Sequence, residues 1–201
     1  MTKIETIDAL EALYGTPGEA PLVKVTPRLI PSYRAWIERS RFCVISTVGP
    51  EGSDGSPRGD ADPVVRVADD STLLLPDWRG NNRIDSLRNI VRDGRISLMF
   101  MVAGSDVVVR VNGTAVVSVD PELVTSFEQR GKHPRSVIVT SIAEVYVQCS
   151  RALMRAGLWK EGDQSEGLPS MGDMLREATS GEFDGAGFDR DWADRAEKTL
   201  Y

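Results

Sequence analysis

Strand-like segments follow one another closely between residues 42 and 148 of this chain. The segments FCVISTVG, PVVRV, TLLLP, RISLMFMVAG, VVVRVNGTAVVSVD and SVIVTSIAEVYVQ are rich in β-branched residues and show little helical periodicity. We count about six strands, and we expect the stretch PEGSDGS between the first two to form a loop. This spacing predicts an antiparallel barrel or sandwich in a chain that is mainly β, of the α+β class.

Helices are expected on both sides of the strand-rich region. Residues 3–14 carry apolar side chains at helical spacing, and the segments SYRAWIERS, CSRALMRAGLW, SMGDMLREATS and DWADRAEKTL also have helical character. We therefore predict an N-terminal helix and linker in residues 1–30, the main domain in residues 31–160, and an acidic helical extension, packed on the same domain, in residues 161–201.

The net charge of −6 is concentrated near the end of the chain. Residues 160–201 contain eleven acidic and five basic residues, which leaves nineteen of each sign in residues 1–159. A neutral body has no basic footprint, so we do not expect nucleic acid as a partner. No apolar run reaches the roughly 18 residues of a membrane helix, and the first residues are acidic, so we expect no membrane association and a cytoplasmic protein.

Metal binding is not expected. Cys43 and Cys149 lie far apart without the spacing of a zinc site, and His133 is the only histidine.

The stretch LPDWRGNNRIDSLRNI, residues 75–90, is rich in arginine and asparagine. Ile84, Leu87 and Val91 share a helical face, which predicts a helix that starts near Asn81 or Asn82. The free N–H groups of a first helical turn attract anions, and Arg79 and Arg83 flank that end. The pattern therefore predicts a phosphate site, although spacing alone equally allows a capped surface helix with solvated arginines. It is neither a P-loop nor a dinucleotide fingerprint.

A second cluster, SPRGD at residues 56–60, precedes the next strand-like run. It combines a rigid Pro57, a cation at Arg58 and a glycine at which a flat ligand can approach the main chain. Adhesion through Arg-Gly-Asp would require an exported protein, for which the sequence gives no sign. Asn112-Gly113 indicates either a tight hairpin turn or a bulge inside a long strand.

Several ordered motifs resemble one protein family. GDADP, LLLPDWRGNNRIDSLRNI, VRVNGTA and VYVQCSRALMRAGLW, in that order, are similar to the pyridoxamine 5′-phosphate oxidase-like flavoproteins. The particular branch has a PxRxGNNRxDSLxNI core, and the similarity covers about residues 30–175. It implies an antiparallel split β-barrel with flanking helices that binds flavin mononucleotide (FMN). It also implies a homodimer with one FMN per subunit in a groove at the interface, and a bent strand at Asn112-Gly113.

The resemblance also implies which residues bind the cofactor. Arg58, Gly59 and Asp60 would border the isoalloxazine, and Arg79, Asn81, Asn82 and Arg83 would hold the phosphate or ribityl chain, together with Pro76, Asp77, Gly80 and Ser86 of the same core. Gln148, Cys149, Ser150 and Arg151 would approach the cofactor from the end of the last strand, from the same or the partner subunit.

The activity implied is that of an FMN-dependent oxidoreductase that transfers a hydride at flavin N5 to or from an unknown small molecule. The alternatives are a non-catalytic module that stores or senses FMN, and a deazaflavin-dependent reductase. Oxidation of vitamin B6 is not expected, because the Arg-Leu-x-Pro segment of those oxidases is missing. Haem degradation is not expected either, because no histidine follows His133. No catalytic residue is predicted; Asp60, Asp77 and Tyr146 are the side chains available as acid or base.

Overall fold

The computed structural model describes residues 1–201. In chain order its elements are α1 (Ile7–Tyr14), α2 (Glu19–Val23), α3 (Pro31–Arg39), β1 (Phe42–Gly49), β2 (Gly52–Gly59), β3 (Arg66–Val67), β4 (Thr72–Asp77), α4 (Asp85–Arg92), β5 (Arg95–Met101), β6 (Val108–Ser118), α5 (Pro121–Thr125), β7 (Ser136–Gln148), α6 (Arg151–Ala156), α7 (Met171–Ala178) and α8 (Gly185–Thr199).

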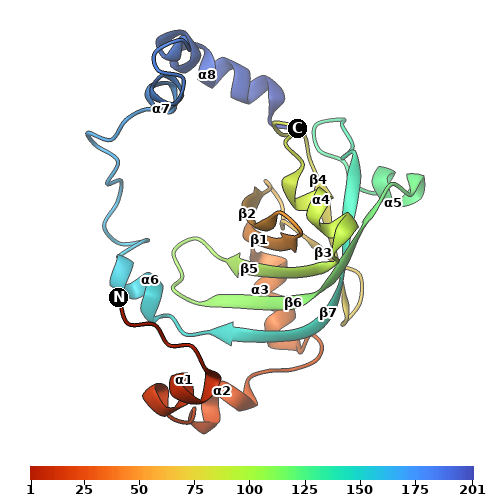
Figure 1. The fold of residues 1–201 in the computed structure, drawn as a ribbon. Helices are drawn as coiled ribbons and strands as arrows, with labels where there is room; N and C mark the ends of the chain where they lie inside the picture. Colours follow the sequence, from red (N-terminus) through yellow and green to blue (C-terminus); the bar gives the residue numbers. More distant parts are fainter.

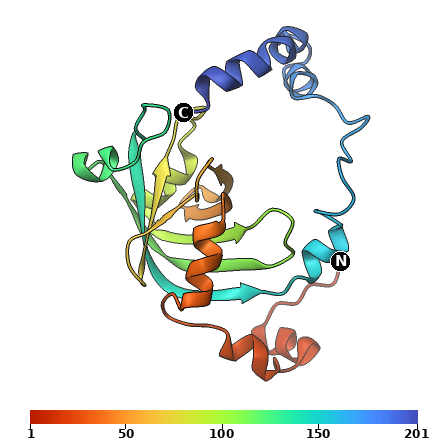
Figure 2. The ribbon, with the colours of Figure 1, turned by 180° about the vertical axis from the view of Figure 1, so that it is seen from behind.

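All seven strands belong to one antiparallel sheet. The strand order is β2-β1-β5-β6-β7-β4-β3, so β2 and β3 are the two edges. The sheet curls strongly around its concave side, as both views of the ribbon show (Figures 1 and 2). The edges do not pair with each other, which leaves the barrel split. The expected α+β class and split-barrel architecture are therefore confirmed.

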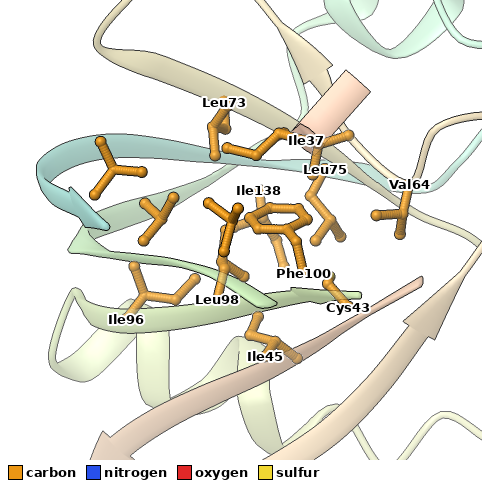
Figure 3. Packing of buried hydrophobic residues seen from close by; sticks show 14 of the residues in the cluster. Ile37, Cys43, Ile45, Val64, Leu73, Leu75, Ile96, Leu98, Phe100 and Ile138 are labelled. Atoms are coloured by element: carbon orange, nitrogen blue, oxygen red, sulfur yellow. The ribbon is translucent and has the colours of Figure 1, made fainter. Parts of the chain in front are cut away.

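Alternation along the strands builds a single core. In β1 the side chains of Cys43 and Ile45 are fully buried, and in β5 Ile96, Leu98 and Phe100 point to the same interior. This is the period of two that a half-buried strand requires. Figure 3 shows these side chains meeting residues of β4, β7 and α3 inside the curl.

Two strand predictions were wrong in extent. PEGSDGS is not a loop, because β2 begins at Gly52 and pairs with β1 along its whole length. PVVRV contributes only the two residues of β3, while Val64 and Val65 enter the core outside a strand. Pairing with a neighbouring strand overrode a composition of Gly, Ser, Asp and Pro that by itself disfavours strands.

The Asn112-Gly113 pair lies inside β6 and marks a bulge. The register between β6 and β7 shifts at this pair, and a Cβ atom on Gly113 would overlap the carbonyl oxygen of Ser141. The bent-strand prediction is therefore confirmed, and the hairpin alternative is excluded. The bulge lets β6 follow the curl of the sheet.

The helices differ in how they contact the barrel. Helix α3 buries Tyr33 and Ile37 in the core, and α4 buries Ile90. Helix α1 buries none of its residues, and α7 and α8 lie against each other, away from the sheet (Figures 1 and 2). No helix combines the length and the apolar character that crossing a membrane would need.

Candidate functional site

A cavity of about 570 Å³ opens where β2, the end of β4 and the connection from β4 to α4 meet. Strand β7 contributes its first residue to the wall, because Ser136 pairs with Asp77 of β4. The cavity is therefore enclosed by elements that are distant in sequence but adjacent in the sheet.

Most of the predicted cofactor residues lie on this wall. They are Arg58, Gly59, Pro76, Asp77, Arg79, Gly80, Asn81, Asn82, Arg83 and Ser86. The two clusters noted in the sequence, at residues 56–60 and 75–90, thus face one space.

The connection between β4 and α4, residues 78–84, is an irregular loop. Helix α4 begins at Asp85 and not near Asn81 or Asn82, so the predicted helix start was wrong. The Asn81 side chain instead accepts a hydrogen bond from the Arg83 N–H at 3.1 Å, which stabilises a turn. Asn82 and Ile84 both have left-handed backbone conformations, with φ of 61° and 54°. This conformation is costly for a β-branched residue such as isoleucine, and such strain is concentrated at functional sites.

Four arginines contribute to the cavity wall. Arg83 is paired with Asp85 at 2.9 Å, whereas the other three have no carboxylate partner. Arg58 donates to the Pro57 carbonyl, Arg135 donates to Asn82 Oδ1 at 3.0 Å, and Arg79 makes no hydrogen bond. Three of the four guanidinium groups thus form no ion pair within the chain and keep N–H donors that a phosphate could use.

Acidic side chains in the wall have distinct environments. Asp54 accepts a hydrogen bond from the Ser86 hydroxyl, so both groups are engaged within the chain. Asp77 makes no side-chain hydrogen bond, and desolvation raises its pKa, although Arg58 and Arg135 oppose that shift. Asp77 is therefore the wall carboxyl best suited to exchange a proton with a bound ligand.

Asp60 does not line the cavity. One of its carboxylate oxygens accepts a hydrogen bond from Trp78 Nε1 at 2.6 Å, and the other accepts one from the Tyr201 hydroxyl at 2.9 Å. Its hydrogen-bonding capacity is thus largely used inside the protein, behind the wall.

Gln148, Cys149, Ser150 and Arg151 lie elsewhere. They follow the far end of β7, whereas Ser136 at the near end lines the cavity. The 13 residues of this strand measure roughly 40 Å along the strand. None of these four residues lines the cavity of its own chain.

The sequence interpretation overlooked several wall residues. Arg135 directly precedes Ser136, which pairs with Asp77, and this tertiary position places it at the site. Trp78 lies inside the quoted motif but was given no role. Leu200 reaches the cavity from the end of α8, which local sequence could not indicate.

A family model described as pyridoxamine 5′-phosphate oxidase matches residues 29–149, which include the whole sheet and most of the cavity wall. The chain belongs to the pyridoxamine 5′-phosphate oxidase family. The resemblance to this family that the sequence motifs indicated is thereby confirmed. No curated protein matches the chain.

Solved structures with a similar fold include members described in this family. HupZ of Group A Streptococcus is 17% identical, with a TM-score of 0.49 over 59% of this chain and 93% of HupZ. A candidate pyridoxamine 5′-phosphate oxidase from Lactobacillus delbrueckii is 22% identical, with a TM-score of 0.48 over 60% of this chain and 95% of that chain. An FMN-binding protein from Syntrophomonas wolfei is 13% identical, with a TM-score of 0.42 over 59% of this chain and 89% of that chain.

Proposed function

We propose that this member of the pyridoxamine 5′-phosphate oxidase family is a cytoplasmic, FMN-dependent oxidoreductase that acts on a small molecule. The observation that carries the proposal is the cavity wall, in which Arg58, Arg79 and Arg135 lack carboxylate partners. The fold and the family agree with this ligand class, and the arginines fit a phosphate monoester.

The phosphate would be held by the loop that follows β4. Arg79 is exposed and makes no hydrogen bond, so it can bind a dianion without breaking an internal contact. Arg83 would share its charge between the ligand and Asp85. Charge-assisted hydrogen bonds contribute about 1.5 to 3 kcal/mol each when water is excluded, and an arginine can donate two of them to one phosphate. Two arginines would then contribute about 6 to 12 kcal/mol, a range that includes the roughly 8 kcal/mol of micromolar binding.

The flavin ring would lie against β2. Gly59 offers bare main chain, and Arg58 lies on the same strand, where its charge would stabilise a reduced, anionic ring. When bound, FMN supplies hydride transfer at N5, while the chain orients the ring and excludes water. Asp77 is the wall carboxyl that would hold or release the accompanying proton.

A homodimer would bring the far end of β7 to the cavity. The four residues from Gln148 to Arg151 do not line the cavity of their own chain, and we propose that they contact the FMN held by the partner subunit.

The test is to purify the protein, record its visible spectrum, denature it and chromatograph the released cofactor. We expect FMN at about one per chain. A colourless protein that also fails to bind added FMN would contradict the proposal, and a released deazaflavin would replace FMN with that cofactor.

A storage or sensing module is the second candidate. The cavity wall contains no His, Cys, Lys or Tyr side chain, which leaves carboxyl groups as its proton carriers. Stopped-flow reduction of the bound flavin by NADH or NADPH separates the two functions. Rapid reduction supports the oxidoreductase, whereas tight binding with no reduction supports the module.

A further inference from the structure

The end of the chain returns to the barrel after a long excursion. Helices α7 and α8 lie away from the sheet. After α8 the last residues of the chain lie near β4 (Figure 1). Helix α8 buries only Gly185 and Gly187, both at its start, yet Tyr201 is 7% exposed and Leu200 lines the cavity. Residues 200 and 201 therefore attach this segment to the barrel at the candidate site.

Tyr201 is held by contacts of several kinds. Its hydroxyl donates to Asp60 Oδ1 at 2.9 Å and accepts from the Ala61 N–H at 3.1 Å. Its ring meets Trp78 edge-on, with 5.2 Å between centroids, and Lys132 Nζ donates to its main-chain oxygen at 2.7 Å. Such complete pairing is characteristic of a defined docking position.

The same contacts extend to the arginine loop. Asp60 bridges Tyr201 and Trp78, because its second oxygen accepts the Trp78 Nε1–H. Trp78 directly precedes Arg79 and itself lies on the cavity wall. The Trp78 indole is therefore held by the Asp60 carboxylate and by the Tyr201 ring. Because Arg79 is the next residue, these contacts also fix the start of the loop that carries it.

We propose that Tyr201 is a positioning residue of the cavity, which acts through Asp60 and Trp78 to hold the 78–83 loop in its anion-binding conformation. The ligand class is a phosphate monoester, and its identity as FMN rests on the proposed function above. The C-terminal residues thus form a strap, with Leu200 as part of the wall and Tyr201 as its anchor.

The phenol is in the protonation state that this role needs. Desolvation and the neighbouring Asp60 carboxylate raise the pKa of Tyr201, although the Ala61 N–H opposes the shift. The hydroxyl therefore keeps its proton at neutral pH and can donate it to Asp60.

The test compares Tyr201→Phe with Tyr14→Phe in the full-length protein. Tyr201→Phe keeps the ring against Trp78 and removes only the hydroxyl, while Tyr14 is an exposed tyrosine of α1. Two probes are titrated into each protein: inorganic phosphate, followed by the melting temperature, and FMN, followed by quenching of its fluorescence.

We expect phosphate to raise the melting temperature of the wild type and of Tyr14→Phe equally. In Tyr201→Phe the same rise should require about tenfold more phosphate, the change that one charge-assisted hydrogen bond can produce. The FMN dissociation constant should increase by a similar factor. If Tyr201 only tethers α8, Tyr201→Phe would lower the melting temperature without ligand and leave the affinities for phosphate and FMN unchanged. That result would overturn the positioning role.

The two proposals can fail separately. Phosphate binding that weakens in Tyr201→Phe, in a protein that ignores FMN, would sustain the positioning role and reject FMN as the ligand. Tight FMN binding that is equal in all three proteins would sustain the flavin and overturn the positioning role. A wild type that responds to neither probe would overturn both.

Discussion

At the scale of single residues, Asn82 combines an unusual backbone with a contact to a wall arginine. Its φ of 61° is left-handed, and its side-chain oxygen accepts a hydrogen bond from Arg135 at 3.0 Å. Asparagine tolerates this conformation better than other residues with a Cβ, because its side chain can bond locally. The loop that carries Arg79 and Arg83 therefore depends on the residue type at position 82.

Two substitutions at this position separate backbone from side chain. Asn82→Ala and Asn82→Gly both lose the hydrogen bond to Arg135, but only alanine has a Cβ atom, which makes the left-handed conformation unfavourable. We expect the free energy of unfolding of Asn82→Ala to lie about 1 kcal/mol below that of Asn82→Gly, measured by urea denaturation. Equal stabilities would show that the loop adopts another conformation.

Asp77 gives the molecule a pH dependence of definite sign. Its pKa is raised by desolvation above the ordinary 3.8, so the folded state holds this proton more tightly than the unfolded state. Its contribution to stability is present at low pH and is lost as the pH rises from about 3.8 through the folded pKa. The change in the free energy of unfolding caused by Asp77→Asn should therefore be more stabilising at pH 7 than at pH 3.

Asp163 provides the control of opposite sign. Hydrogen bonds from Ser165 lower its pKa, so its contribution is present above the ordinary pKa and is lost as the pH falls. The change in the free energy of unfolding caused by Asp163→Asn should be less stabilising at pH 7 than at pH 3. Urea denaturation of both variants at the two pH values checks the pair, and the same trend in both would refute the assignment for Asp77.

At the scale of elements, the β6 bulge determines how the sheet curls. The register of β6 against β7 shifts between Asn112 and Gly113, and no side chain fits at Gly113 because the Ser141 carbonyl faces it. The curl brings edge strand β2 close to the end of β4, where the cavity lies. Strand β6 lies between these two strands in the sheet order, so we expect its bend to be required for the site as well as for the fold.

Substituting Gly113 tests this requirement. We expect Gly113→Ala to lower the free energy of unfolding by about 2 kcal/mol, because its methyl group would displace the main chain of β7. Gly55→Ala, in edge strand β2 with open space around it, should change stability by less than about 0.5 kcal/mol. Similar losses in the two variants in urea would show that the close approach at Gly113 is absent.

The same element shows what sequence patterns can predict and where they stop. Runs of β-branched residues predict strands β1, β4, β5, β6 and β7, because each run contains the alternation of side chains that buries one face of a strand. Strand β2 has no such signal, because pairing with β1 makes it a strand. The start of α4 was misplaced because contacts from Arg135, which lies 53 residues away, fix the loop before it.

At the scale of the whole molecule, the candidate site depends on contacts that no local pattern encodes. The two arginine-bearing clusters were predicted to bind one ligand, and the curl of the sheet places both on one cavity. The docking of Tyr201 on Asp60 spans 141 residues and could not have been predicted. The separation of the cavity from the far end of β7 likewise appears only in the fold, and it makes the partner subunit part of the proposed cofactor site.

The exposed apolar residues and the acidic charge lie mostly outside the barrel. Helix α1 leaves Ile7, Leu10 and Leu13 exposed, and α8 leaves Trp192 exposed. None of the eleven acidic residues of the segment 160–201 lines the cavity. The wall itself contains four arginines and three aspartates, so its formal charge is 4 − 3 = +1, which favours an anionic ligand.

The central claim, that this cavity holds the phosphate of FMN, is tested most directly by comparing FMN with riboflavin, which lacks the phosphate. Dissociation constants for both are measured in the wild type, in Arg79→Ala and in Arg190→Ala, with Arg190 as an exposed control arginine of α8. We predict that the wild type and Arg190→Ala prefer FMN by about 100-fold, the effect of two charge-assisted hydrogen bonds, and that Arg79→Ala reduces this preference to about tenfold. A preference that Arg79→Ala leaves unchanged, or equal binding of both flavins by the wild type, would contradict the account.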